Sequence, residues 1–212
     1  LPFALRIDAW NNLVAGGDGT TDAFSFNPAT GAVLNGQDGI RELNMYPGGG
    51  TNNKKNGGGS GGGQFPQLGP GNFGTVDIGS SNNSTADLAR QILHGPNQSD
   101  LAYHGGELKL NSDGFLMLNG DTGLSAGMKD ELEAIKGKPR VIPIFDQVTG
   151  NGNNAMYRII AFAGIRIVNV DLTGSMSDKR VIIQPAAVVD HTAQTGAGGT
   201  AHFVYAPLRL TR

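Results

Sequence analysis

Short runs of alternating apolar and polar residues, separated by Gly, Asn and Asp, make up most of the chain. Residues 23–26 and 32–34 alternate on either side of the turn at 27–31, and this pattern predicts a β-hairpin. A further strand is predicted at 40–46, after an Asn-Gly and an Asp-Gly break. The pattern of residues 74–79 predicts another short strand. The first third of the chain therefore predicts β structure joined by tight turns.

Two segments show helical spacing of apolar residues. The first begins after Ser84 or Thr85, either of which can cap a helix, and it ends at Gly95. The second is capped by Ser125 and stopped by Gly137. The expected buried stripes are Leu88, Ile92 and Leu93 in the first helix, and Met128, Leu132 and Ile135 in the second. We therefore expect two short amphipathic helices.

The strongest β pattern lies in the last third of the chain. The expected strands are 140–145, 155–172, 181–189 and 203–210, preceded by a hairpin that joins 107–110 to 115–118. Because Pro143 cannot donate a ladder hydrogen bond, the strand at 140–145 is expected at an edge or a bulge. Gly164 in the longest strand indicates a bulge or a close backbone approach. The strands at 140–145 and 203–210 are the edges expected to add a strand from a neighbour.

These patterns predict an α+β, β-rich fold: an antiparallel-rich mixed sheet or sandwich with two short helices and a long Gly-rich loop. We expect one domain spanning residues 1–212. Within it, residues 47–70 form a Gly/Asn-rich loop or linker, since Gly brings no side chain to pack.

Composition narrows the possible functions. The chain of 212 residues contains 34 Gly and no Cys, and its net charge is −2. The absence of Cys excludes disulfides, thiolate metal sites and Cys nucleophiles. Without a basic stripe there is no electrostatic basis for nucleic-acid binding. No histidine pair has zinc-ligand spacing, and no Gly-x-Ser-x-Gly sequence is present. We therefore expect a protein that is not an enzyme and holds no cofactor.

One segment has a residue spacing that could indicate a metal-binding site. Asp171, Thr173 and Ser175 have the Asp-x-Thr-x-Ser spacing of a metal-adhesion motif, in which one carboxylate and two hydroxyls hold a divalent cation. The same residues also suit a turn between two strands, which is the favoured interpretation. Asp-Gly and Asn-Gly pairs near Asp22, Asp38 and Asp121 could likewise bind Ca²⁺ or simply form turns.

Several segments together resemble the carboxy-terminal region of TadG-like (TadE/TadG) proteins of bacterial tight-adherence pili. The matching segments are 1–5, 70–79, 82–88, 118–127, 139–146 and 152–167, and they span nearly the whole chain except the Gly-rich stretch. The resemblance implies an extracytoplasmic location in the periplasm, at the cell surface or outside the cell. It also implies membrane attachment only through an amino-terminal helix that this sequence does not include, so that the chain would be a fragment or a matured form.

Three functions remain open. The first is a non-enzymatic structural or interaction module of the bacterial envelope, pilus-associated or part of a surface filament, with protein partners or copies of itself. The second is a Ca²⁺-dependent adhesin or glycan-binding domain that uses the Asp-rich turns. The third is a hydrolase whose catalytic carboxylates do not belong to any recognisable sequence motif. The resemblance favours the first.

Overall fold

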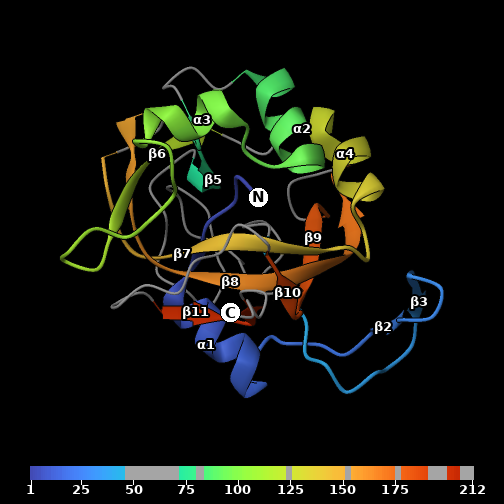
Figure 1. The fold of residues 1–212 in the computed structure, drawn as a ribbon. Helices are drawn as coiled ribbons and strands as arrows, with labels where there is room; N and C mark the ends of the chain where they lie inside the picture. The colour runs from blue at the N-terminus through green and yellow to red at the C-terminus, as the bar shows by residue number, and fades with distance from the viewer. Residues whose placement is uncertain are drawn as a thin grey trace, which may run out of the picture.

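The computed structural model describes residues 1–45, 72–79, 84–122, 126–150, 154–174, 178–190 and 200–205. A curled mixed sheet carries a few short helices (Figure 1). Within the described ranges, six strand pairs are antiparallel and three are parallel. The predicted class, a β-rich α+β fold with a mixed and mainly antiparallel sheet, is confirmed.

The sheet is organised around β8 (Met156–Asp171), a strand of 16 residues. Along one side it pairs with β7 (Pro139–Thr149). Along the other side it pairs in succession with β6 (Leu116–Thr122), β11 (Thr200–His202) and β9 (Arg180–Pro185). The register of β8 slips against both β7 and β9. Such irregularities bend and twist strands, which is consistent with the curl of the sheet.

The curl brings the two ends of the sheet together. At one end, β1 (Leu5–Arg6) runs parallel to β7; at the other, β5 (Asn72–Val76) pairs with β6. The residues just before β1 then reach β5: the Ala4 amide donates to the Gly74 carbonyl at 2.6 Å, and the Val76 amide donates to the Pro2 carbonyl at 3.0 Å. The strand order β5-β6-β8-β7-β1 is thus joined end to end.

The space inside this closed sheet is filled by one apolar cluster. Its buried members are Ala4, Val76, Ile78, Leu118, Phe145, Ala155, Tyr157 and Ile159. Phe145 and Tyr157 meet edge to face, with ring centroids 4.9 Å apart. Burial raises the pKa of Tyr157 to about 12. A Cβ at Gly120 would lie 2.6 Å from the Tyr157 ring, so the close packing here depends on that glycine.

Helices cover the outside of the sheet. In Figure 1, α2 (Thr85–His94), α3 (Gln98–Tyr103) and α4 (Lys129–Ala134) lie together on one side, and α1 (Ile7–Ala15) lies on the opposite side. The predicted stripe residues Leu88, Ile92, Met128, Leu132 and Ile135 are all in the larger apolar core, and Leu93 packs against it. Both expected helices are therefore confirmed, although Ser125 lies outside the described residues.

Two helices were not expected from the sequence. α1 buries Ala9, Trp10 and Leu13 and ends at Gly16, whose φ of +66° closes the last turn. α3 begins with a reciprocal capping box: the Asp100 amide donates to the Asn97 side chain at 2.9 Å, and the Asn97 amide donates to the Asp100 carboxylate at 2.7 Å.

The expected amino-terminal hairpin is confirmed as β2 (Phe24–Asn27) and β3 (Ala32–Asn35). It projects from the body of the molecule (Figure 1). A buried carboxylate anchors its base: Glu42 accepts hydrogen bonds from the Ala23 amide at 3.0 Å and the Phe24 amide at 2.7 Å. Glu42 directly precedes β4 (Leu43–Asn44), which pairs with β9, so the carboxylate ties the hairpin to the sheet.

Two strand predictions are wrong. Residues 140–145 are not an exposed edge, because β1 pairs with Ile144 and Phe145 on the side of β7 that faces away from β8. Pro143 is tolerated there next to a register slip between Ile144 and Phe145, so the predicted bulge is correct. Residues 107–110 are not a strand either. Leu108 and Leu110 pack against the inner core, and β6 pairs with β5 and β8 instead.

The remaining predictions are partly met. The segment 181–189 divides into β9 and β10 (Val188–Val189). The carboxy-terminal segment contains β11 and β12 (Val204–Tyr205), and the predicted continuation to 210 lies outside the described residues. The Gly/Asn-rich loop at 47–70 also lies outside them. Gly164 does mark a close backbone approach, since a Cβ there would lie 2.3 Å from the Ala186 carbonyl oxygen.

Candidate functional site

A small parallel ribbon forms a second sheet, which lies against the main sheet at Gly164. β10 pairs in parallel with β12, and Val188 and Val189 oppose Val204 and Tyr205. The Val188 amide donates to the Phe203 carbonyl at 2.8 Å. Parallel pairs usually occur inside sheets that are covered on both faces. A two-stranded parallel ribbon with outward-facing apolar residues is therefore an uncommon surface feature.

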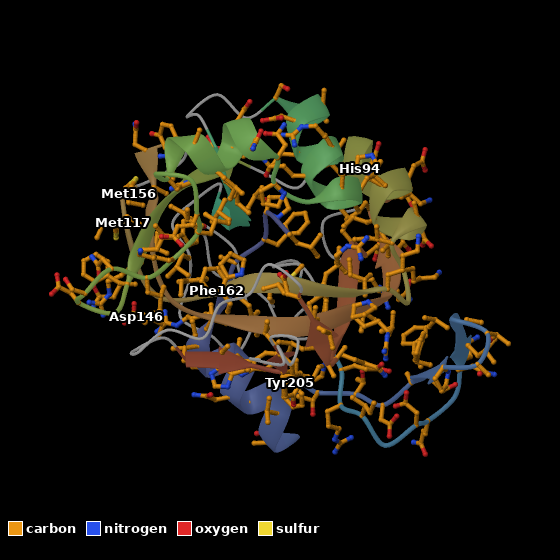
Figure 2. The ribbon with its side chains drawn as sticks, in the orientation of Figure 1. His94, Met117, Asp146, Met156, Phe162 and Tyr205 are labelled. Atoms are coloured by element: carbon orange, nitrogen blue, oxygen red, sulfur yellow. The ribbon has the colours of Figure 1, made fainter. Side chains whose placement is uncertain are left out.

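The ribbon presents apolar side chains to solvent. Val189 is 59 % exposed, and its register partner Tyr205 is 54 % exposed. Phe203, at the entry to β12, is 40 % exposed. Contiguous apolar groups on a surface mark contact sites more often than isolated ones do. We call Val189, Phe203 and Tyr205 the ribbon surface; Figure 2 labels Tyr205 within it.

Phe203 holds an unusual backbone conformation. Its φ of +58° lies in the left-handed region, which costs a bulky residue about 1–2 kcal/mol. Trp10, only 1 % exposed, lies beneath it with ring centroids 6.0 Å apart at 76°, and the Trp10 ring also meets His202 at 5.7 Å. Contact with a buried helix residue thus holds the aromatic ring in place at the surface.

Two of the three residues with metal-motif spacing, Asp171 and Thr173, hydrogen-bond to each other. The Thr173 amide and the Thr173 hydroxyl donate to Asp171 Oδ1 at 3.1 and 2.8 Å, and Gly174 has a φ of +81°. These bonds from Thr173 lower the pKa of Asp171. Ser175 lies outside the described residues, so the three-residue set stays a prediction.

The Asp-rich turns near the hairpin are occupied by backbone donors. The amides of Asp38 and Gly39 donate to Asp22 at 3.0 and 3.2 Å, and the Phe26 amide donates to Asp38 at 3.0 Å. The Gln184 side chain lies between Asp38 and Glu42. Across the described ranges, no three His, Cys, Asp or Glu side chains are grouped so that they could hold a metal ion.

The histidines of the described ranges lie on different elements of the fold. His94 lies exposed in the last turn of α2, and His202 contacts Trp10. His104 follows α3 and meets Tyr103 edge to face; burial lowers its pKa. His191 lies outside the described residues. Nothing in the described ranges therefore brings two of these imidazoles to one site.

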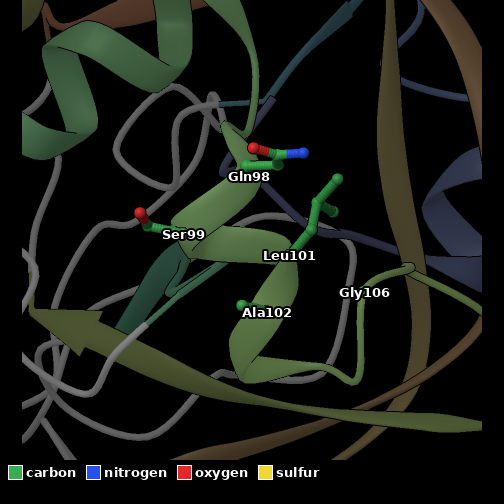
Figure 3. A pocket seen from close by; sticks show the side chains of 5 residues that line it. All are labelled: Gln98, Ser99, Leu101, Ala102 and Gly106. Atoms are coloured by element: carbon green, nitrogen blue, oxygen red, sulfur yellow. The ribbon is translucent and has the colours of Figure 1, made fainter.

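A shallow depression borders α3 (Figure 3). It is lined by Gln98, Ser99, Leu101, Ala102 and Gly106, all of them uncharged. These residues offer an amide and a hydroxyl beside small apolar groups. Such a lining supplies contacts but no ionisable group.

No helix in the described part of the chain combines the length and hydropathy needed to cross a membrane. Comparison with protein-family models, with curated proteins and with solved structures finds no match.

Proposed function

We propose that this chain is a non-catalytic structural module of the bacterial cell envelope, and that it associates with other copies of itself through the ribbon surface. The observation that carries the proposal is the exposure of Val189 and Tyr205, side by side on a parallel two-stranded ribbon. Burying these side chains against a second molecule would remove apolar area from water, which favours association.

The backbone of the ribbon also favours association between copies, through the addition of a strand. Val188 and Asp190 donate to Phe203 and Tyr205 from one edge of β10. In a strand, alternate residues direct their backbone groups to opposite edges, so those of Val189 and Val204 face away from this pairing. An added strand would use such groups for hydrogen bonds, while Val189 and Tyr205 supply side-chain contacts.

Three carboxylates of the described residues have structural roles that fit this function. Glu42 anchors the hairpin, and the Asp100 carboxylate caps α3 and pairs with Arg90 at 2.8 Å. Asp146 and Arg158 form a two-bonded pair between β7 and β8. Each of these carboxylates joins two elements of the fold.

The envelope location and the link to tight-adherence pili rest on the resemblance to TadG-like proteins. The high content of Gly, Asn, Ser and Thr, with few charged residues, is in keeping with such a location. Fractionation of cells that express the full-length protein would test it: recovery in the envelope fraction is expected, and recovery in the cytosol would contradict it.

Sedimentation velocity over a range of protein concentrations tests the association. Wild-type protein should form larger species as concentration rises, and a variant with Val189→Ser and Tyr205→Ser should remain monomeric. The control is Tyr103→Ser, because Tyr103 is 61 % exposed but lies on α3. Wild-type protein that stays monomeric, or equal loss of association in the control, would overturn the proposal.

A further inference from the structure

The two outer edges of the β2–β3 hairpin can be assigned from its register. The Gly36 amide donates to the Ala23 carbonyl at 2.9 Å, two residues along from the pair Ser25 and Leu34. Alternate pairs of an antiparallel ladder exchange hydrogen bonds, so Ser25 and Leu34 also bond to each other. The residues next to them on each strand therefore direct their backbone groups away from the hairpin, to its outer edges.

The outer edge of β2 is covered by side chains. The Phe24 amide donates to the Glu42 carboxylate at 2.7 Å, and the Phe26 amide donates to the Asp38 carboxylate at 3.0 Å. The Phe24 carbonyl accepts from the Gln184 side chain at 3.2 Å. Native proteins block exposed edges, often with charged groups, because a free edge can pair with another chain. β2 is therefore closed to an added strand.

The outer edge of β3 lacks this cover. Val33 and Asn35 direct their amides and carbonyls to it, and within the described ranges no hydrogen bond is formed across this edge. β3 contains neither a charged residue nor Pro, the two kinds of residue that commonly protect an edge strand. Figure 1 shows the hairpin standing out from the body of the molecule. β3 is therefore an open strand edge.

The two faces of the hairpin also differ. Phe26 and Val33 share the inner face, where the Arg166 guanidinium lies 3.4 Å from the Phe26 ring centroid. A Cβ placed on Gly137 would lie 3.5 Å from Val33 Cγ2, so this face packs closely on the body. Successive residues of a strand face opposite sides, so Leu34 lies on the outer face, where it is 55 % exposed. The hairpin thus holds Leu34 towards solvent beside the open edge.

We propose that β3 pairs antiparallel with β3 of a second copy of this chain, about a two-fold axis at Leu34. The open backbone groups set this register: Val33 of each copy opposes Asn35 of the other, and they exchange at most about four hydrogen bonds. Leu34 then opposes Leu34 of the second copy in a pair without hydrogen bonds, where side chains approach most closely. The same uncharged surface is used by both copies, as a two-fold contact requires.

This contact is small, so its role rests on the proposed self-association through the ribbon surface. A few hydrogen bonds and one pair of Leu side chains bury far less than the roughly 800 Å² per partner of a stable interface. The contact therefore acts between copies that the ribbon surface already holds together, because assembly raises their effective concentration. The hairpin and the ribbon surface use different residues, so β3 stays open in ribbon-joined copies and links them into longer assemblies.

Disulfide trapping tests the register. The chain has no Cys, so Leu34→Cys introduces a single thiol, and the two-fold axis brings two such thiols within bonding distance. Oxidised glutathione should convert this variant into a covalent dimer, and the bond captures even a weak contact because it accumulates. The control is Ala29→Cys, exposed in the turn of the same hairpin but away from the axis; it should react about tenfold more slowly or less. Equal rates, or no covalent dimer of Leu34→Cys, would overturn the proposal.

Sedimentation velocity of Leu34→Lys separates the two contacts. Like charges directly opposite each other repel, so this variant should form the ribbon-joined species and lack the longer ones. Ser25→Lys, on the same face but on the covered strand, should assemble as wild type does. Wild-type growth of Leu34→Lys would overturn the β3 contact and leave the ribbon surface standing. If wild-type protein stays monomeric, the ribbon proposal fails, and trapping of Leu34→Cys still decides the β3 contact.

Discussion

Phe3 forms a β-bridge with Thr75, and this contact joins the two ends of the sheet. The neighbouring Gly74 makes the approach possible. Its φ is +80°, and a Cβ there would lie 2.7 Å from the Ala4 carbonyl oxygen. The closure therefore depends on a glycine for two reasons, the left-handed backbone and the short distance to the facing strand.

Gly74→Ala should open this closure. Gly114→Ala is a matched control, because Gly114 has a φ of +81° and a Cβ added there would meet nothing within 4 Å. The control should cost about 1 kcal/mol from backbone strain alone. Gly74→Ala should cost about 1–3 kcal/mol more, the range for forced overpacking. Urea denaturation of both variants measures the difference, and equal losses would contradict the closure.

Glu42→Gln should destabilise the protein by about 1–3 kcal/mol. Glu42 Oε1 accepts from Phe24 and Gln184, while Oε2 accepts from Thr21 and Ala23. Both positions accept hydrogen bonds, so a glutamine side chain in either orientation would place its NH₂ group against other hydrogen-bond donors. Hydrogen exchange of the 21–27 backbone should accelerate. The comparison is Glu107→Gln, whose side chain is 52 % exposed and should be near neutral; unchanged exchange in Glu42→Gln would refute the anchor.

Asp146→Asn should flatten the acid side of the stability profile. Arg158 donates to both carboxylate oxygens, and this hydrogen bonding lowers the pKa of Asp146. A carboxyl group whose pKa is depressed by folding stabilises the native state above its unfolded pKa of about 3.9, and this contribution disappears as pH falls through the folded value. The pair is partly exposed, so about 0.5–1 kcal/mol is expected at neutral pH.

A double-mutant cycle with Arg158→Met measures that pair directly. The coupling free energy should be present at about pH 7 and should vanish near pH 2, where the carboxylate is protonated. A coupling that does not depend on pH would show that packing, and not the ion pair, links the two residues. Phe115 is the neighbour to consider, because the Arg158 guanidinium lies 5.9 Å from its ring centroid.

Local patterns predicted those elements whose signals lie within a few residues. Ser84 caps α2 as expected, with the Asp87 amide donating to its hydroxyl at 3.2 Å. α1 was harder to predict because Arg6 precedes it without a side-chain cap and Asn11-Asn12 are weak helix formers. The signals that could have revealed it were the buried spacing of Ala9, Trp10 and Leu13, and Gly16 after the last turn.

The closure of the sheet, and the approach of Asp77 and Asp100 to each other beside Gly79, depend on contacts between residues distant in sequence. Nothing near Asp77 indicates that α3 will bring Asp100 beside it. The Asn97-x-x-Asp100 spacing could have identified α3 as a capped helix, but it does not reveal what the cap faces. Likewise, Val189 and Tyr205 become neighbours only through parallel pairing, which short-range patterns do not encode.

The most direct test of the proposed self-association is thiol labelling at the ribbon surface. Because the chain has no Cys, Tyr205→Cys and Tyr103→Cys each introduce a single reactive thiol. We predict that maleimide labelling of Tyr205→Cys slows as protein concentration rises, while that of Tyr103→Cys stays constant. Labelling of Tyr205→Cys that is independent of concentration, under conditions in which wild-type protein assembles, would contradict the account.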